Sequence, residues 1–210
     1  GAITLDGFEI FFEERRPFFV ENKNIFDYRV GGGQDNLFFS RRIGRSPQGG
    51  VSSDTITYVD QPTNSTILGA AKFSGKTKNG WSVGVLESVT SKEYAKTVDQ
   101  NGEMGKTLVE PLSNYLVSRV QKDFNDRNSY VGGIFTATNR KLEDNLSFLH
   151  ENAYTGGIDF KHNWRDRKYY VLGDIVISNV NGSPEAIENT QTSLRHLFQR
   201  VDAGHLSVDP

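Results

Sequence analysis

The sequence predicts an all-β, antiparallel fold: an up-and-down meander of about nine strands that forms a β-barrel or part of one. Three observations predict it. Apolar and polar residues alternate along segments of about ten residues, short turns join these segments, and no long amphipathic helix is evident. Strands joined by turns of two to five residues pair with their neighbours in sequence, which gives a meander.

The alternation is clearest in residues 152–164. Successive side chains of a strand point to opposite faces, so every second residue shares a face. One face would carry Asn152, Tyr154, Gly156, Ile158, Phe160, His162 and Trp164. The other would carry small, polar or charged residues. This segment is therefore expected to be a strand with one apolar and aromatic face.

The N-terminal quarter of the chain is rich in phenylalanine and is less regular. Pro17 lacks a backbone donor and pushes Arg16 toward extended geometry, so a turn is expected there. In chain order we expect a strand, a charged turn and an irregular stretch within 1–28, a glycine loop at 31–33, a strand at 36–44, a loop at 45–54 and a short strand at 55–59.

Three hairpins are expected in the rest of the chain. They pair 65–77 with 81–94, 114–124 with 130–139, and 152–164 with 168–180. The Asn79-Gly80 pair predicts a type I′ turn in the first hairpin, because both central residues of that turn need positive φ. Of the remaining segments, 99–111 is expected to be a polar loop, 140–150 a helical turn or loop, 181–192 a long loop and 193–201 a strand.

Length and composition narrow the class of protein. The 210 residues suit one β-domain, residues 1–210. No apolar run approaches the roughly 18 residues of a spanning helix, which excludes a helical membrane protein, whereas a transmembrane β-barrel is compatible because only alternate residues face lipid. A net charge of −2 gives no support for a nucleic-acid partner, and the absence of cysteine excludes disulfides and thiol chemistry. No signal-peptide pattern opens the chain, so we expect either no export or a mature segment of a longer chain.

The solvent on the apolar face decides between a membrane barrel and a soluble β-domain. The predicted strands are long, and aromatic residues gather at their ends, as in an interfacial girdle: Trp81, Tyr94, Tyr115, Tyr130, Tyr154, Trp164, Tyr169 and Tyr170. The opposite face is too charged for a dry core: Lys72, Lys76, Arg119, Gln121, Asp159, Lys161 and Asp174. Glu87 interrupts the apolar face, and a one-sided soluble sheet is the alternative.

Two motifs carry a family resemblance: FFEERRPFFVENKNIF at 11–26 and LFFSRRIGRSPQG at 37–49. With ILGAAKFSGKTKNGWSVGVLESVT and LFQRVDAGH, they resemble a family of secreted Gram-negative proteins. In that family a family-9-like carbohydrate-binding domain precedes a long C-terminal domain of unknown function that looks like an outer-membrane β-barrel. The chain resembles the start of that C-terminal domain, so it is expected to be a fragment. The resemblance implies an outer-membrane location and no established activity, and the family's xylanase-like label belongs to the missing domain.

The charged residues of the two motifs are expected to form a structural ion-pair network, because arginine binds carboxylates bidentately and keeps its charge. Its members are Glu13, Glu14, Arg15, Arg16, Arg41 and Arg42, with Arg45 nearby. A solvated turn and an anion-binding site are the alternatives.

A carbohydrate site is a further candidate. Trp81 and Trp164 would stack on sugars, and Glu87 and Asp159, with Asp174, would supply carboxylates. No catalytic residue, metal site or cofactor is assigned, because the histidines lack ligand spacing and no nucleophile motif is present.

We expect a non-enzymatic outer-membrane β-barrel-like protein that acts in uptake, binding or envelope structure, with membrane lipid as its partner. The alternative is a soluble or surface β-domain, periplasmic or extracellular, that binds or hydrolyses polysaccharide as a xylanase-like glycoside hydrolase. The oligomeric state is not predicted.

Overall fold

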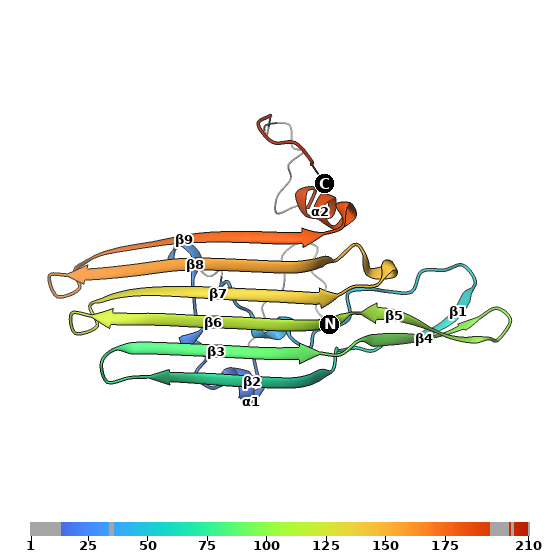
Figure 1. The fold of residues 1–210 in the computed structure, drawn as a ribbon, viewed down its shortest axis with the longest axis horizontal. Helices are drawn as coiled ribbons and strands as arrows, with labels where there is room; N and C mark the ends of the chain where they lie inside the picture. The colour runs from blue at the N-terminus through green and yellow to red at the C-terminus, as the bar shows by residue number, and fades with distance from the viewer. Residues whose placement is uncertain (1–13, 34–35, 194–201, 203, 210) are drawn as a thin grey trace.

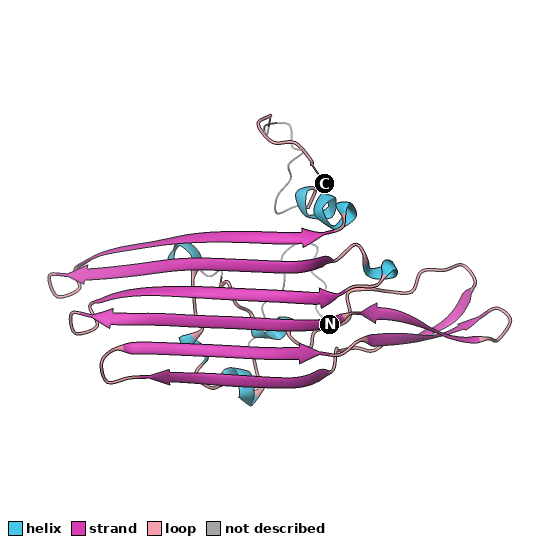
Figure 2. Ribbon diagram, in the orientation of Figure 1, coloured by secondary structure: helices cyan, strands magenta, loops and turns pink. Residues whose placement is uncertain are grey.

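The strands form two antiparallel sheets, as the computed structural model of the chain shows (Figures 1 and 2). It describes residues 14–33, 36–193, 202 and 204–209. Six strands make a meander in the order β2-β3-β6-β7-β8-β9, and three make a smaller sheet in the order β1-β4-β5. The strands are β1 (Ile56–Asp60), β2 (Ile67–Lys76), β3 (Trp81–Thr90), β4 (Glu93–Asp99), β5 (Met104–Glu110), β6 (Leu112–Phe124), β7 (Ser129–Lys141), β8 (His150–Trp164) and β9 (Tyr169–Gly182). The predicted all-β antiparallel meander of nine strands is confirmed. Within the described residues the large sheet does not close on itself, because β2 and β9 are its edges.

The large sheet has two chemically different faces, because residues directly opposite one another on paired strands lie on the same face. The registers place Trp81, Lys122, Val131, Phe160 and Gly173 in one row across β3 to β9. We call the face that carries this row the outer face. The seven polar and charged side chains predicted to share the opposite face all lie there, on what we call the inner face.

An N-terminal segment, residues 14–33 and 36–46, covers the inner face (Figure 1). It supplies Phe19, Ile25, Phe26, Tyr28 and Ile43 to the core. The sheet supplies Leu86, Val117 and Ile134. Its described residues form short helical turns, α1 (Pro17–Val20) and 3₁₀ turns at Lys23–Ile25, Val30–Gly32 and Ser40–Arg42, and one isolated antiparallel bridge between Arg29 and Asn36. The strand predicted at 36–44 is therefore wrong. Leu37, Phe38 and Ile43 pack into the core between this segment and the inner face, and do not pair with a neighbouring strand.

The smaller sheet corrects the predicted loop at 99–111. Most of that stretch is β5, which pairs with β4, and the chain leaves the large sheet after Thr90 rather than continuing to Tyr94. Figure 1 shows this sheet projecting beyond one end of the large sheet. At this end the chain passes through β4 and β5 between β3 and β6, whereas short turns join the strands at the opposite end.

The β2–β3 turn does not have the predicted type I′ geometry. In the β2–β3 turn only Gly80 has positive φ, and its amide donates to the Thr77 carbonyl, as in a type I turn followed by a left-handed glycine. The β6–β7 and β8–β9 turns instead hold three consecutive non-glycine residues in the left-handed region, 125–127 and 165–167. Their sequences, Asn-Asp-Arg and Arg-Asp-Arg, are nearly the same.

The C-terminal part corrects a second predicted loop. Residues 184–191 form helix α2 (Pro184–Gln191), whose start is capped by Ser183: its Oγ accepts a hydrogen bond from the Ala186 amide at 3.1 Å. A further 3₁₀ turn, Asp144–Leu146, agrees with the helical turn or loop expected at 140–150. The strands predicted within 1–13 and at 194–201 lie outside the described residues. Among the residues that the structure describes, no helix has both the length and the apolar character needed to cross a membrane.

We expect Arg127→Gly to stabilise the protein. Arg127 has a φ of 64°, and this left-handed conformation costs a residue with a side chain roughly 1 kcal/mol. Glycine avoids this cost, but the greater conformational freedom of glycine in the unfolded chain cancels part of the gain. The net gain in the free energy of unfolding should be about 0.5 kcal/mol, measured by denaturant titration. Lys96→Gly, in the middle of β4, is the control and should lose a similar amount. A loss in Arg127→Gly would contradict the assigned strain.

Candidate functional site

The outer face exposes large apolar side chains across all six strands. They include Phe73 at 69% exposure, Ile158 at 62%, Ile175 at 71% and Ile177 at 73%. No described element covers this face, whereas soluble proteins rarely leave so extended an apolar surface open. Exposed apolar surfaces of this extent are typical of interaction surfaces.

Polar side chains frame the apolar surface at the end with long connections. Asn114, Asn139, Asn152 and Asn181 lie in one row across four strands, and the Asn139 Nδ2 donates to the Asn152 Oδ1 at 2.7 Å. Glu87, which interrupts the apolar pattern in the sequence, lies next to this row and accepts a hydrogen bond from Asn114 at 3.0 Å. Among the described strand residues of this face, Glu87 is the one carboxylate, and it lies at the polar margin.

Aromatic side chains frame the end with short turns. His162, Trp164 and Tyr169 stack in series, with centroid distances of 5.6 and 6.0 Å. The Lys122 ammonium lies over the Trp81 and Phe124 rings and donates to the Asn79 carbonyl in the turn, so its charge reaches the end of the sheet. Of the eight aromatic residues expected at strand ends, Trp81, Tyr154, Trp164 and Tyr169 lie on the outer face. Tyr115, Tyr130 and Tyr170 lie on the inner face, and Tyr94 lies in the smaller sheet.

Tyr28 anchors the N-terminal segment to the inner face. Its hydroxyl reaches the carbonyls of Ile158 and Ile175, at 2.9 and 3.2 Å, and its ring lies directly over Gly157. A Cβ at Gly157 would stand 2.7 Å from the ring, so only glycine permits this approach. Burial, followed by the charges of Asp159 and Asp174, raises the pKa of Tyr28, so the hydroxyl stays protonated as a donor.

A buried ion pair lies beside Tyr28. Both terminal nitrogens of Arg119 donate to the Asp159 carboxylate, at 2.6 and 2.8 Å, and the Arg119 guanidinium also faces the Tyr28 ring. The pair joins β6 to β8 across β7, where Gly132 leaves the room; a Cβ there would be 2.7 Å from the guanidinium. Because Arg119 is only 2% exposed, its charge depends on Asp159 for compensation.

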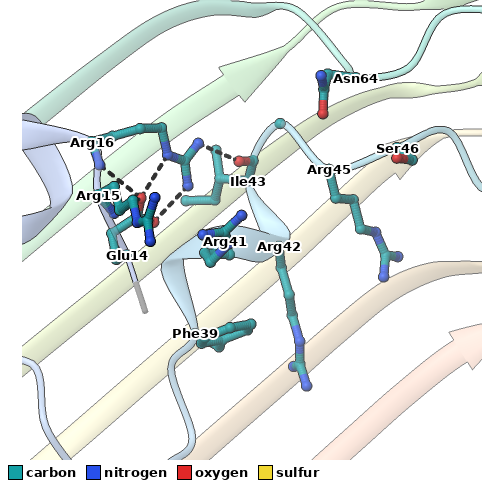
Figure 3. A pocket seen from close by; sticks show the side chains of 11 residues that line it. Glu14, Arg15, Arg16, Phe39, Arg41, Arg42, Ile43, Arg45, Ser46 and Asn64 are labelled. Carbon is teal, nitrogen blue, oxygen red and sulfur yellow. Dashed lines mark hydrogen bonds and ion pairs between the residues drawn. The ribbon is translucent and has the colours of Figure 1, made fainter. Parts of the chain in front are cut away.

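An arginine-lined cavity of about 610 Å³ lies at the start of the N-terminal segment (Figure 3). Glu14 accepts hydrogen bonds from the Arg16 side chain at 2.7 and 2.9 Å and from the Ser40 hydroxyl at 2.7 Å. Arg16 also donates to the carbonyls of Ser40 and Ile43 at 2.9 and 2.7 Å. Burial alone would raise the pKa of Glu14, but the hydrogen bonds from Arg16 and Ser40 outweigh it and lower the pKa to about 2.

The predicted ion-pair residues come together in part. Glu14 and Arg16 pair, and Arg15, Arg41 and Arg42 line the same cavity. Glu13 lies outside the described residues.

The predicted carbohydrate residues are not brought together. Trp81, Trp164 and Glu87 lie on the outer face, whereas Asp159 lies on the inner face and is engaged by Arg119, so the two carboxylates do not face a common site. Asp174 also lies on the inner face, where it accepts a hydrogen bond from the Gly31 amide at 2.8 Å. Within the described residues, no three His, Cys, Asp or Glu side chains gather in a way that would hold a metal ion.

Sequence reasoning missed Tyr28 and the pairing of Arg119 with Asp159. Gly132 and Gly157 were the available signal, because an interior strand glycine often marks a close backbone approach. Nothing in the sequence named the groups that approach them.

A family model described as a domain of unknown function, DUF5916, matches residues 2–203 of the chain. No curated protein and no solved structure matches it.

Gly157→Ala should loosen the N-terminal segment, because its methyl group would displace the Tyr28 ring. We expect a loss of about 1–3 kcal/mol in the free energy of unfolding and faster tryptic cleavage within 14–33. Gly156→Ala is the matched control: it adds the same methyl group one residue away, in open space on the outer face. Equal effects of the two variants would contradict the anchoring role of Tyr28.

The Glu14 contacts should weaken only in strong acid. The folded pKa of about 2 lies below the ordinary value of 4.5, so the contribution of Glu14 to stability is complete above about pH 4.5 and disappears as the pH falls toward 2. An NMR titration of the side-chain carboxyl carbon should give a midpoint near 2. Ser40→Ala should raise this midpoint, since it removes one donor, and a wild-type midpoint near 4.5 would refute the network.

Proposed function

The chain belongs to the DUF5916 family, a domain of unknown function, and from its geometry we propose that it is an outer-membrane protein whose large sheet is part of a barrel wall. The outer face would meet lipid, and the N-terminal segment would fill the inside. The role that we propose is in uptake, binding or envelope structure. The observation that carries the proposal is the uncovered apolar outer face with its polar and aromatic margins.

The dimensions of the apolar surface fit a bilayer. Along β9, the outer side chains are Tyr169, Val171, Gly173, Ile175 and Ile177, after which Asn179 and Asn181 begin the polar margin. These eight residue steps span roughly 27 Å along the strand, or roughly 22 Å along an axis inclined by 35°. Transmembrane barrels carry an apolar band about 25 Å tall between aromatic girdles.

The stagger of the short turns supports the proposed tilt. The β6–β7 hairpin extends two residues beyond the row of Trp81 and Lys122, to Phe124 and Ser129. The β8–β9 hairpin extends two residues further, from His162 to Trp164. Two residues are roughly 6.8 Å and two strand spacings roughly 9.6 Å, so the turns follow a line inclined by roughly 35°. Barrel strands tilt by about 35–45° to the membrane normal.

The two ends of the sheet also differ as the proposal requires. Outer-membrane barrels have short turns on the periplasmic side and long connections outside. On this basis the three short turns face the periplasm, and the small sheet with the connection at 142–149 faces outward (Figure 1). In this arrangement the charged inner face lines the inside of the barrel, and the N-terminal segment fills part of that space.

Tryptophan fluorescence tests the proposal, since the chain's two tryptophans, Trp81 and Trp164, both lie on the outer face. In vesicles of phosphatidylcholine brominated in the acyl chains, we expect strong quenching in Trp164→Phe, which reports on Trp81, and in Trp81→Phe, which reports on Trp164. The two variants should be quenched to a similar extent, because Trp81 begins β3 and Trp164 ends β8, and both of these strand ends border a short turn.

The control removes both tryptophans and adds Tyr58→Trp, on the exposed face of the small sheet. Aqueous iodide should quench this probe and brominated lipid should not. The membrane proposal would be refuted, in favour of a soluble β-domain, if the chain stays monodisperse without detergent and brominated lipid does not quench its tryptophans.

A further inference from the structure

Two cavities flank the chain between Phe39 and Arg45. The first is the arginine-lined cavity of about 610 Å³ (Figure 3), and the second, about 230 Å³, lies between this stretch and the inner face of β6 to β8. Phe39, Arg42, Ile43 and Arg45 line both. The two cavities are therefore neighbouring parts of one region.

Positive charge dominates this region. Arg15, Arg16 and Arg41 line the first cavity, Arg140 lines the second, and Arg42 and Arg45 belong to both. Among the described residues that line the two cavities, Glu14 is the single carboxylate. Its charge is already engaged by Arg16. Arg140 is attracted by the buried carboxylate of Glu110 but repelled by Arg45, and an anion between Arg45 and Arg140 would relieve that repulsion.

Two of these guanidinium groups also have buried nitrogens without partners. The Nε atoms of Arg45 and Arg140 are buried and have no hydrogen-bond acceptor among the described residues. Buried donors in folded proteins are normally paired, and an anion in the adjoining cavities would offer acceptors to both of these nitrogens. Arg41 and Arg42 have interactions of their own and add only charge to the argument.

We propose that this region binds a phosphate group, either on a free solute or on a lipid headgroup. The planar guanidinium fork matches the oxygens of a phosphate bidentately, and several forks around one cavity suit a multiply charged anion better than a single carboxylate. The site goes beyond the proposed membrane function and does not depend on it, because the cavities lie on the covered side of the sheet. The proposed site gives the arginines of the two sequence motifs a role in ligand binding as well as in structure.

Calorimetric titration of the purified full chain with inorganic pyrophosphate, at fixed ionic strength, tests the site, with sodium chloride as the blank. Arg45→Gln and Arg140→Gln should each weaken binding about tenfold or more, because each removes charge-assisted hydrogen bonds. Arg45→Lys should fall between, since it keeps the charge and loses the fork. Arg165→Gln, in the β8–β9 turn, is the matched control and should bind as the wild type does.

A second arm replaces pyrophosphate by phosphatidic acid in mixed detergent micelles, with phosphatidylcholine as its blank. Binding in this arm alone identifies a lipid headgroup, and binding in the first arm alone identifies a soluble phosphate; either supports the site. Circular dichroism checks the fold, and Arg42→Gln, at an exposed side chain, replaces any variant that does not fold. No binding in either arm, or an equal loss in Arg165→Gln, would overturn the proposal. Because both titrations measure binding by the purified chain without membrane insertion, the phosphate site can fail while the membrane proposal stands, and the reverse.

Discussion

The close approach of the N-terminal segment to the inner face is the constraint on which the structure depends. Tyr28 can lie against the sheet only because Gly157 has no side chain, and Arg119 can reach Asp159 only because Gly132 has none. Removing one partner of such a buried pair costs roughly 3–5 kcal/mol, since the other charge is left uncompensated. The apolar contacts of the segment, from Phe19 to Ile43, supply the favourable burial, while the polar contacts determine where the segment lies. Apolar burial alone would allow the segment to lie at several positions on the sheet. The bidentate ion pair and the tyrosine hydroxyl can form their hydrogen bonds at only one of them.

This arrangement separates the environments of the two faces. The inner face has a partner within its own chain, and that partner is polar where the sheet is charged: the Gly31 amide donates to Asp174, and Lys72 donates to the carbonyls of Phe18 and Glu21. The outer face has no such partner among the described residues, yet it carries the larger apolar side chains. A soluble one-sided sheet has the reverse arrangement, with its apolar face covered and its charged face open to water. The inversion is therefore a stronger argument for lipid than strand length or alternation, which both classes share.

Alternation made most of the large sheet predictable. Its strands could be placed within a few residues, and the charged residues could be assigned to one face, because both follow from side-chain order along the chain. Residues 104–110 were missed because their strand is polar and is selected by pairing with β4, which is not a local property. Residues 36–44 were misassigned because their phenylalanines serve a packing contact with the sheet. The site was less predictable still. Glu14 and Arg16 are close in sequence, but Arg140 meets Arg45 at a cavity only because the N-terminal segment folds back over β7.

The edges of the sheet place a further physical condition on the membrane proposal. β2 and β9 each have one side without a strand partner among the described residues, over 10 and 14 residues. Water can satisfy these backbone groups, but the hydrocarbon of a bilayer cannot, and each unpaired group there costs several kcal/mol. On the membrane proposal, a lipid-facing wall would therefore require strands paired with both edges, supplied by further protein chain or by neighbouring copies. The roughly 35° stagger of the hairpins is compatible with this, because it is the inclination at which added strands continue the same band around a closed wall.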